Sequence, residues 1–303
     1  MSLLDPPLIN PLDDGRIQLR HGPIDLIIEA FGLPAEVELA YQQAINSFKT
    51  VLFDLVDELS GLRKPYGTNS PLFQGNVANA MASVAKEFSV NRFVTPMIAV
   101  AGAVADHILS DMTKGRDLSR AYVNNGGDIA IFLNKGQSLN VGVCANPLEG
   151  AVVSTANVLE HNDIRGVATS GWRGRSHSLG IADSVTVLAR TAATADAAAT
   201  LIANAIDLPN HPKIKRKPAS ELAPDSDLGD RMVTVDVCGL TMSETFCALE
   251  SGQRVARTMI DAGQIAGVYG CLNTQTFSLN PTCFDIDQRE LCSDYRDKEL
   301  ACA

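Results

Sequence analysis

The spacing of hydrophobic residues changes along this chain, and the change predicts both helices and antiparallel strands. Between residues 37 and 59, apolar side chains recur at every third or fourth position, which predicts one long helix with a single buried stripe. After residue 120, short apolar runs alternate with turn sequences such as NNGGD and NKGQ, which predict antiparallel strands. The sequence therefore contains both helical segments and segments typical of antiparallel strands.

Other segments predict further elements. The stretch Arg16–Ala30 predicts two short strands around a turn at residues 21–23. Gly75–Phe88 and Met97–Met112 predict helices, the second so rich in Ala and Gly that it can closely approach another backbone or a ligand. We expect the strands between residues 121 and 158 to form one antiparallel meander, and Pro209–Asp230 to be an exposed connection. Further strands are expected at residues 167–170, 184–189, 232–237 and 265–272, and further helices at 191–205 and 243–262.

The length of the chain allows more than one domain arrangement. A chain of 303 residues can form one large domain or two smaller ones. We expect a single α+β domain over residues 1–280. Residues 281–303 are charged and weakly patterned, so we expect them to form a peripheral C-terminal tail.

Charge and hydropathy exclude several classes of partner. The net charge of −10 has the wrong sign for a protein that binds nucleic acid or anionic lipid. The longest apolar run, Phe93–Ala105, contains Pro96 and is shorter than the roughly 20 residues that a membrane helix requires. The start of the chain lacks the basic and apolar regions of a secretory signal. We therefore expect a cytoplasmic protein without a nucleic acid or membrane partner, and we leave open a homo-oligomer.

The cysteines argue against a disulfide scaffold and a zinc site. There are seven, an odd number, and none belongs to a C-x-x-C pair. Most buried cysteines behave as small hydrophobic residues, so the pattern indicates at most a reactive thiol.

The first candidate site is the sequence VNNGGDI at residues 123–129. Gly126 and Gly127 allow positive φ, which a tight hairpin requires, so an ordinary turn explains the pattern. The functional alternative is that the two glycines let a ligand approach the backbone while Asp128 forms a hydrogen bond with it.

The second candidate site is the glycine-rich stretch Gly166–Gly180. It contains Arg173, Arg175 and His177 together with several hydroxyl side chains. Two Arg side chains and exposed backbone N–H groups suit an anionic ligand such as a phosphate. Loops often carry charge without binding anything, so a solvated loop is the alternative. His177 is a candidate general acid or base because its charge changes near neutral pH, although a lone His is more often an ordinary loop or packing residue.

The third candidate site is a pair of oxygen-bearing residues on one predicted helix. Asp196 and Thr200 are four positions apart, which places them on the same helix face in an Ala-rich setting. Mg²⁺ prefers carboxylate and neutral oxygens, and it often completes its shell with water or a ligand phosphate. The alternative is that Asp196 only interacts favourably with the helix dipole.

Several motifs in one order resemble those of the ApbE-like superfamily. They are PMIAVAGAVAD at Pro96–Asp106, VNNGGDI at Val123–Ile129, the GVATSG and SHSLGIADSVTV segments within Gly166–Val187, and ADAAATLIAN at Ala195–Asn204. The sequence looks closest to a small branch of that superfamily, related to the FAD:protein FMN transferases. The resemblance covers about residues 95–204.

The resemblance implies a T-fold-like α+β architecture with an antiparallel sheet and packed helices. It also implies kinship with enzymes that use FAD and Mg²⁺ to transfer FMN onto a Thr or Ser of an acceptor protein. Asp196 and Thr200 match the family's metal ligands. His177 matches the position of a family histidine. Residues matching the flavin pocket are Gly126, Gly127, Asp128, Thr169, Ser170 and Gly171.

Two departures from the family pattern bear on activity. The transferases' D-P-x-T-G continuation is absent after His177, where this chain has Ser178–Asp183. The transferases' K-G-x-x-x-D segment is replaced by Ala101–Asp106, which lacks the lysine. Two functions therefore stay open. One is a Mg²⁺-dependent, transferase-like enzyme that binds FAD or another phosphate-bearing flavin nucleotide. The other is a non-catalytic or accessory protein without FMN transfer, in sulfur metabolism, with cysteines carrying the sulfur.

Under either function the ligand is a small anionic molecule, with an acceptor protein as a further partner of the enzyme. We expect the Gly126–Asp128 turn, the Thr169–His177 loop and the Asp196/Thr200 helix to line one cleft, because they are the ligand-friendly segments of the sequence.

Overall fold

The structure is a computed structural model that describes residues 6–144, 152–280 and 284–285 of the chain. The chain divides into two compact units. The first consists of Met1–Leu139, Leu159–Ala168 and Leu188–Ala198, and the second of Asn140–Val158, Thr169–Val187 and Ala199–Ala303. Both contain helices and antiparallel strands, which confirms the predicted α+β fold. The single domain over residues 1–280 stays a prediction.

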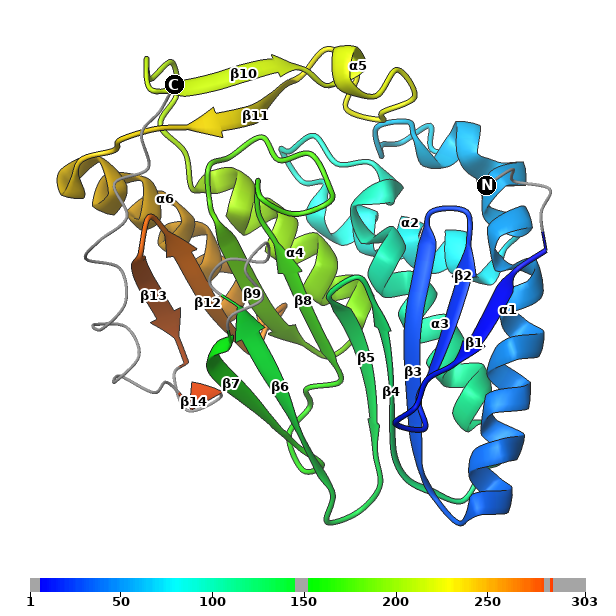
Figure 1. Cartoon of the computed structure of the whole chain (residues 1–303). Helices are drawn as coiled ribbons and strands as arrows, with labels where there is room; N and C mark the ends of the chain where they lie inside the picture. Colours follow the sequence, from blue (N-terminus) through cyan, green and yellow to red (C-terminus); the bar gives the residue numbers. More distant parts are fainter. Residues whose placement is uncertain (1–5, 145–151, 281–283, 286–303) are drawn as a thin grey trace. The chain divides into compact units, whose positions relative to one another are not determined.

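The first unit contains an antiparallel sheet (Figure 1). Alternate residues of β3 (Ile24, Leu26, Ile28 and Ala30) are buried, the period of a strand with one face on the core. The strands pair in the order β1 (Leu8–Pro11), β2 (Ile17–His21), β3 (Ile24–Gly32), β4 (Leu118–Asn125), β5 (Asp128–Leu133) and β8 (Gly166–Ser170).

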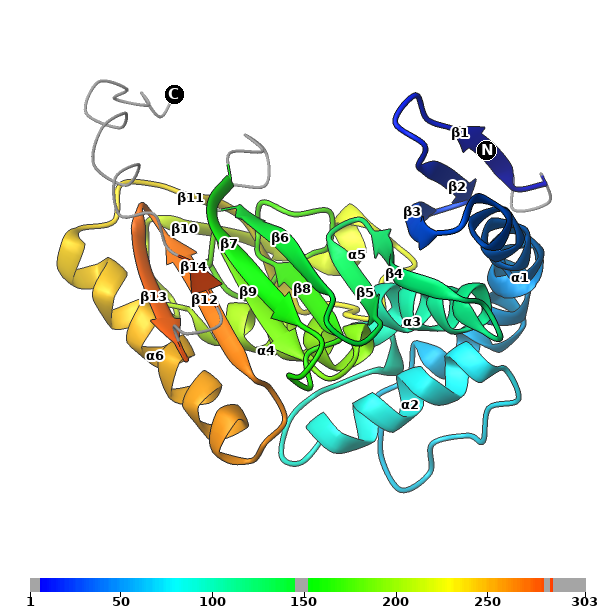
Figure 2. The same ribbon diagram turned by 90° about the horizontal axis from the view of Figure 1, so that it is seen from below.

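Helices cover this sheet. The predicted long helix is α1 (Pro34–Leu62), and its buried stripe includes Phe48, Leu52 and Leu55. α3 (Val100–Thr113) packs on β4 and β5, and α2 (Asn76–Phe88) lies on the other side of α3 (Figure 2). The segment before α3 differs from the prediction, because Pro96–Ala99 forms a short 3-10 helix (η1) rather than α-helix. Pro96 occupies the first turn, where its missing N–H costs no intrahelical hydrogen bond.

The second unit contains strands β9 (Ser184–Ala189), β12 (Gly267–Leu272) and β13 (Gln275–Leu279), in that order in the sheet. α6 (Met242–Asp261) packs on β12 and β13. There are two further small sheets. One consists of β10 (Ile214–Pro218) and β11 (Met232–Val237). The other has the strand order β14 (Phe284–Asp285), β7 (Val152–Leu159) and β6 (Ser138–Cys144). β8, β9 and α4 (Ala192–Ala205) contribute residues to both units.

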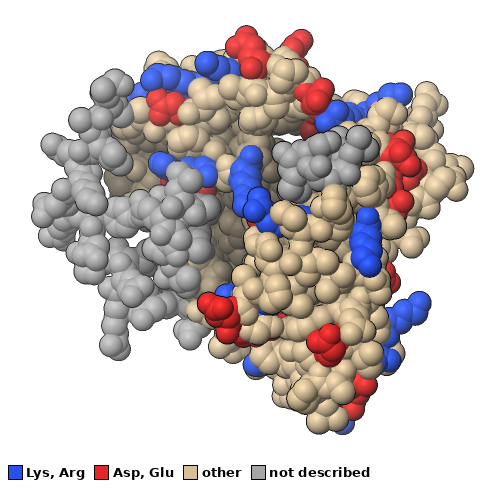
Figure 3. Space-filling view, turned by 45° about the vertical axis from the view of Figure 1, so that its right-hand side comes forward, with Lys and Arg blue, Asp and Glu red and all other residues tan. Residues whose placement is uncertain are grey.

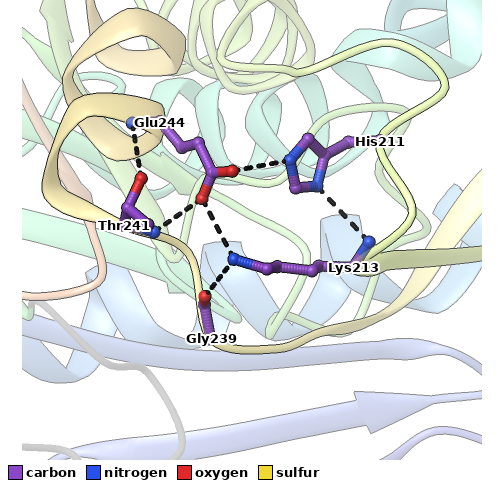
Figure 4. A network of polar contacts seen from close by, with 5 residues as sticks. All are labelled: His211, Lys213, Gly239, Thr241 and Glu244. Carbon is purple, nitrogen blue, oxygen red and sulfur yellow. Dashed lines mark hydrogen bonds and ion pairs between the residues drawn. The ribbon is translucent and has the colours of Figure 1, made fainter.

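A polar network fixes the start of α6 (Figure 4). The Thr241 side chain accepts a hydrogen bond from the Glu244 backbone N–H, and Glu244 Oε2 accepts one from the Thr241 backbone N–H at 2.6 Å. Glu244 also lies 3.0 Å from His211 Nε2 and 3.3 Å from Lys213 Nζ. This reciprocal capping box satisfies N–H groups that a helix leaves unpaired at its start.

Two sequence predictions about topology are wrong. The strands after residue 121 do not form one meander, because β5 pairs with β8, whereas β6 and β7 belong to a separate sheet. The segment Pro209–Asp230 is not merely a connection, because it contains β10 and the short helix α5 (Ala219–Leu222). The sequence IKRKP is too polar to have predicted a strand, because its exposed positions carry charged side chains.

The expected C-terminal tail, residues 281–303, lies outside the described residues except for β14. β14 pairs antiparallel with β7, and Phe284 is buried. The expected NPLEG turn at residues 146–150 also lies outside the described part of the chain. Among the described residues, no helix has both the length and the apolarity to cross a membrane.

Candidate functional site

Asp196 lies on α4 and is hydrogen-bonded to the start of α3 in the first unit. Its Oδ2 accepts a hydrogen bond from the backbone N–H of Gly102 at 3.0 Å. The side chain is half-buried. Burial raises the pKa of the Asp196 carboxyl, and the nearby Asp106 carboxylate raises it further, whereas hydrogen bonds from Gly102 and Ala101 lower it. Asp196 is therefore a carboxylate in a position that favours a neighbouring positive charge.

Asp106 makes the reciprocal contact from α3 to the start of α4. Its two carboxylate oxygens accept hydrogen bonds from the backbone N–H groups of Ala192, at 3.0 Å, and Ala193, at 2.9 Å. Burial raises the pKa of Asp106 to about 6, although these two hydrogen bonds oppose the shift. The helix starts approach so closely that a Cβ on Gly102 would lie 2.3 Å from the Ala192 carbonyl oxygen. Glycine at position 102 is therefore required by the backbone of α4.

The β4–β5 turn reaches the same helix start. Asn125 pairs with Asp128, and the two residues between them, Gly126 and Gly127, have φ of 66° and 115°. The expected tight hairpin turn is therefore present. Asn125 Nδ2 donates a hydrogen bond to the Ala101 carbonyl at 3.1 Å, which connects the turn to the residue before Gly102. A Cβ on Gly127 would meet open space, so the backbone there is accessible.

In the second unit, Thr200 Oγ1 donates a hydrogen bond to Ser170 Oγ at 3.3 Å. Thr200 lies one helical turn after Asp196 on α4 and is half-buried. Thr169, which precedes Ser170 on β8, has its Oγ1 2.8 Å from Thr186 Oγ1 on β9. The structure thus brings Thr200, a predicted metal ligand, into contact with Ser170, a predicted residue of the flavin pocket.

One end of the predicted anion-binding loop is held by Asp183. Asp183 Oδ1 accepts hydrogen bonds from Arg173 Nε at 2.7 Å and from Trp172 Nε1 at 3.2 Å. The Trp172 backbone N–H donates to the Ala182 carbonyl at 3.0 Å. A Cβ on Gly171 would lie 2.4 Å from the Asp183 carbonyl oxygen, so this position needs glycine. Arg173 is therefore an ion-paired residue in this structure.

The other end of the loop is held by α4 and the β10–β11 hairpin. The side-chain oxygen of Asn204 accepts hydrogen bonds from Ser178 Oγ at 3.2 Å and from the Leu179 N–H at 2.9 Å. The Arg216 guanidinium donates to the Leu179 carbonyl, and the Thr234 N–H donates to the Ser178 carbonyl. The stretch between the two anchors, residues 174–177, is exposed and includes Arg175 and His177.

The described residues contain no cluster of three or more His, Cys, Asp or Glu side chains that could hold a metal ion. A cation at Asp196 would draw on the Asp196 carboxylate, with the Asp106 carboxylate nearby, and on the oxygens of water or of a bound ligand. This donor set suits Mg²⁺, which is commonly bound by one or two carboxylates and ligand phosphates. The expectation that all three candidate segments line one cleft stays a prediction.

Sequence reasoning did not single out Asn125, Asp183 or the capping role of Asp106. Asp183 precedes a buried strand and Asp106 interrupts an Ala-rich helix, so a charged residue in an apolar setting was the available signal. Their partners could not be read from the sequence, because the hydrogen bonds that Asp106 accepts span 86 and 87 residues.

The cysteines and surface charge bear on the alternatives. Burial raises the pKa of the Cys271 thiol to about 12, and the nearby Asp183 carboxylate raises it as well. This thiol is therefore protonated and a poor nucleophile. Basic and acidic side chains are interspersed on the face drawn in Figure 3 among the described residues.

A groove of about 570 Å³ in the second unit is lined by polar and apolar side chains. Its charged lining groups already have partners, since Arg216 pairs with Asp207 and His211 with Glu244. The lining residues are Asp207, Pro209, Asn210, His211, Ile214, Arg216 and Met232.

The sequence is similar to known proteins over most of its length. Residues 9–278 match the protein family described as AbpE bacteria. A UPF0280 protein of Methanospirillum hungatei is 32% identical over 180 residues, 57% of this chain and 70% of the relative. A UPF0280 protein of Methanococcus vannielii is 35% identical over 52% of this chain and 66% of the relative. A UPF0280 protein of Methanothermobacter thermautotrophicus is 40% identical over 39% of this chain and 44% of the relative. The chain thus spans between 44% and 70% of the length of these relatives.

Two solved structures show a distant similarity. A mutant of the flavin transferase ApbE from Vibrio cholerae has 12% identity and a TM-score of 0.41, covering 90% of this chain and 96% of that one. The apo form of the Pseudomonas stutzeri flavinyl transferase ApbE has 10% identity and a TM-score of 0.37, covering 92% and 96%.

Proposed function

Because the chain belongs to the AbpE bacteria family, which it matches over residues 9–278, we propose that it binds a flavin nucleotide with Mg²⁺ and acts as a transferase-like enzyme. The family match confirms the resemblance to the ApbE-like superfamily that the motifs indicated. The ligand, the metal and the reaction are the parts that we propose. FAD is the nucleotide to test first, with an acceptor protein as the second substrate.

The observation that carries the proposal is the position of Asp196. Its half-buried carboxylate accepts a hydrogen bond from the first turn of α3, and burial raises its pKa. A carboxylate whose ionised form is poorly solvated gains from a nearby cation. When bound, Mg²⁺ supplies positive charge that neutralises ligand phosphate oxygens. Thr200 adds a neutral oxygen one helical turn further along α4.

The remaining predicted site residues have roles consistent with this ligand. Gly126 and Gly127 expose backbone beside Asp128, and a Cβ on Gly127 would meet open space. The hydroxyls of Thr169 and Ser170 and the backbone of Gly171 are the groups we assign to the nucleotide. We assign the anionic groups of the ligand to Arg173 and Arg175.

We assign His177 as the residue that would accept the proton of an acceptor protein's hydroxyl if this chain transferred FMN. Its side chain is exposed beside the anchored Ser178 and forms no hydrogen bond or ion pair with a described residue. The anchors at Asp183 and Asn204 hold both ends of that loop. An imidazole on an anchored loop can meet a large second substrate that does not enter a deep pocket.

A specific observation favours the second function, a binding or accessory protein without FMN transfer. Ala101 occupies the position where the transferase pattern has a lysine, and Ser178–Asp183 replaces the D-P-x-T-G stretch. In this chain the Ser178–Leu179 segment anchors the loop instead. The protonated thiol of Cys271 argues against a sulfur-carrying role for that cysteine.

The test is thermal unfolding of the purified protein with FAD, with Mg²⁺ and with both. At a hundredfold excess over Kd, a ligand that binds only the folded state stabilises it by about 2.7 kcal/mol. We expect this gain to require Mg²⁺ and to be lost in Asp196→Asn. Asp57→Asn, at an exposed position on α1, is the matched control and should behave like wild type. Equal stabilisation of Asp196→Asn and wild type would contradict the proposal.

A further inference from the structure

Asp183 is a nearly buried carboxylate that gathers donors from two parts of the second unit. Its side chain is 13% exposed. Oδ1 accepts hydrogen bonds from Arg173 Nε and Trp172 Nε1, and Oδ2 accepts one from the Asn273 backbone N–H at 2.6 Å. A buried carboxylate held by three donors, one of them charged, has little freedom to rotate.

The contact with Asp183 leaves part of the Arg173 guanidinium unused. The carboxylate is bonded to Nε, and the two Nη atoms form no hydrogen bond with any described residue. The guanidinium carbon lies 4.6 Å from the centre of the Trp172 ring, so the ring supports the guanidinium plane. The side chain is 32% exposed. Its plane and direction are therefore fixed while the Nη edge is free to bind.

The turn between β12 and β13 also holds the Asp183 carboxylate. Asn273 and Thr274 form the two-residue turn between β12 and β13, with φ of 49° and 65°. Thr274 is β-branched, so this left-handed conformation is costly and needs support from its surroundings. The hydrogen bond from the Asn273 N–H to Asp183 is one such support.

We infer that Asp183 is a positioning residue, which holds Arg173 so that its two Nη groups take a phosphate of the ligand as a bidentate pair. The inference rests on the proposed function and deepens it, because it assigns one anionic subsite within the candidate site. A planar guanidinium fork matches phosphate oxygens, whereas a lysine ammonium does not. Because Asp183 accepts its hydrogen bond from Arg173 Nε, the two Nη groups of Arg173 stay available for a phosphate.

The experiment uses Trp172 as its reporter, because the chain contains one tryptophan. Wild type, Asp183→Asn and Arg173→Lys are titrated with pyrophosphate in Mg²⁺ and followed by tryptophan emission. Asn273→Gly is the matched control, since it keeps the backbone N–H and the left-handed φ. Circular dichroism establishes that each variant is folded.

We expect pyrophosphate to bind about tenfold more weakly to Asp183→Asn and Arg173→Lys, the loss of one charge-assisted hydrogen bond or more. Asn273→Gly should bind like wild type, and Asp183→Asn should shift the unliganded Trp172 emission. Arg173→Lys keeps a positive charge opposite Asp183, so it decides the question if Asp183→Asn does not fold. Equal affinity of wild type and Arg173→Lys, or no pyrophosphate binding to wild type, would overturn the inference.

Parallel titrations with FAD and with riboflavin, which lacks phosphate, separate this inference from the proposed function. FAD binding that is unaffected by both variants leaves the flavin proposal standing and removes the Asp183 role. Pyrophosphate binding that depends on Asp183, without any binding of FAD, removes the flavin assignment and keeps the subsite.

Discussion

Asp106 and Asp196 each accept hydrogen bonds from the start of the helix that carries the other. Asp106 on α3 binds the N–H groups of Ala192 and Ala193, and Asp196 on α4 binds the N–H of Gly102. A carboxylate at a helix N-terminus is favourable because it satisfies unpaired N–H groups and opposes the positive end of the dipole. These reciprocal hydrogen bonds hold the starts of α3 and α4 together, and Asp196, the candidate metal ligand, takes part in them.

The close approach of α3 and α4 predicts a large effect of Gly102→Ala. Alanine normally stabilises a helix relative to glycine, by roughly 0.5–1 kcal/mol. Here the added Cβ would lie 2.3 Å from the Ala192 carbonyl oxygen, and a backbone atom cannot move aside easily. We expect the free energy of unfolding to fall by about 1–3 kcal/mol, measured by urea denaturation. Ser110→Ala, exposed on the same helix, should change it by less than about 0.5 kcal/mol, and a stabilised Gly102→Ala would contradict the packing.

The polar network at the start of α6 predicts how stability depends on pH. Hydrogen bonds, first from the Thr241 backbone and then from Thr241, His211 and Lys213 side chains, lower the pKa of Glu244 from 4.5 to about 2. A folded-state pKa below the unfolded value means that the ionised group stabilises the fold above pH 4.5. That contribution disappears as the pH falls towards 2.

Glu244→Gln should therefore have a lower Tm than wild type at pH 7, because glutamine keeps the capping geometry but not the charge. The difference should shrink as the pH is lowered from 4.5 to 2. Scanning calorimetry across this range measures it. A difference that is constant with pH would show that the charge of Glu244 does not contribute.

Cysteine labelling distinguishes a sulfur-carrying role from a packing role. Cys271 is buried with a pKa raised to about 12, whereas Cys247 on α6 is exposed. We expect iodoacetamide at pH 8 to label Cys247 in the native protein and to label Cys271 only after denaturation. Peptide mass spectrometry locates the labels. Rapid native labelling of Cys271 would restore it as a candidate sulfur carrier.

Transfer of FMN separates the two proposed functions. The protein is incubated with FAD, Mg²⁺ and a Thr-containing acceptor protein, and the acceptor is weighed by mass spectrometry. Because the transferase lysine and the D-P-x-T-G stretch are absent, we expect little or no covalent FMN adduct. An adduct that requires Mg²⁺ and is lost in Asp196→Asn would establish a working transferase.

The sequence alone predicts those helices and turns whose pattern is contained in a short stretch of residues. The stripe of α1 repeats at helical spacing, and the glycines at 126 and 127 supply the positive φ of the β4–β5 turn. Asp196 and Thr200 were recognisable as a pair because their spacing matches one helical turn. These features could be predicted because their physical causes are contained in short stretches of chain.

Contacts distant in sequence specified the rest. β5 pairs with β8 instead of β6, and Gly166 permits this region to close because a Cβ there would lie 2.1 Å from the Thr191 backbone. The partner of Asp196 is 94 residues away, and the Asn273 N–H that holds Asp183 is 90 residues away. No local pattern encodes such distances, since residues with the same hydrophobic spacing can pair in many ways. The tertiary fold selects one pairing by burying apolar surface without leaving buried polar groups unpaired.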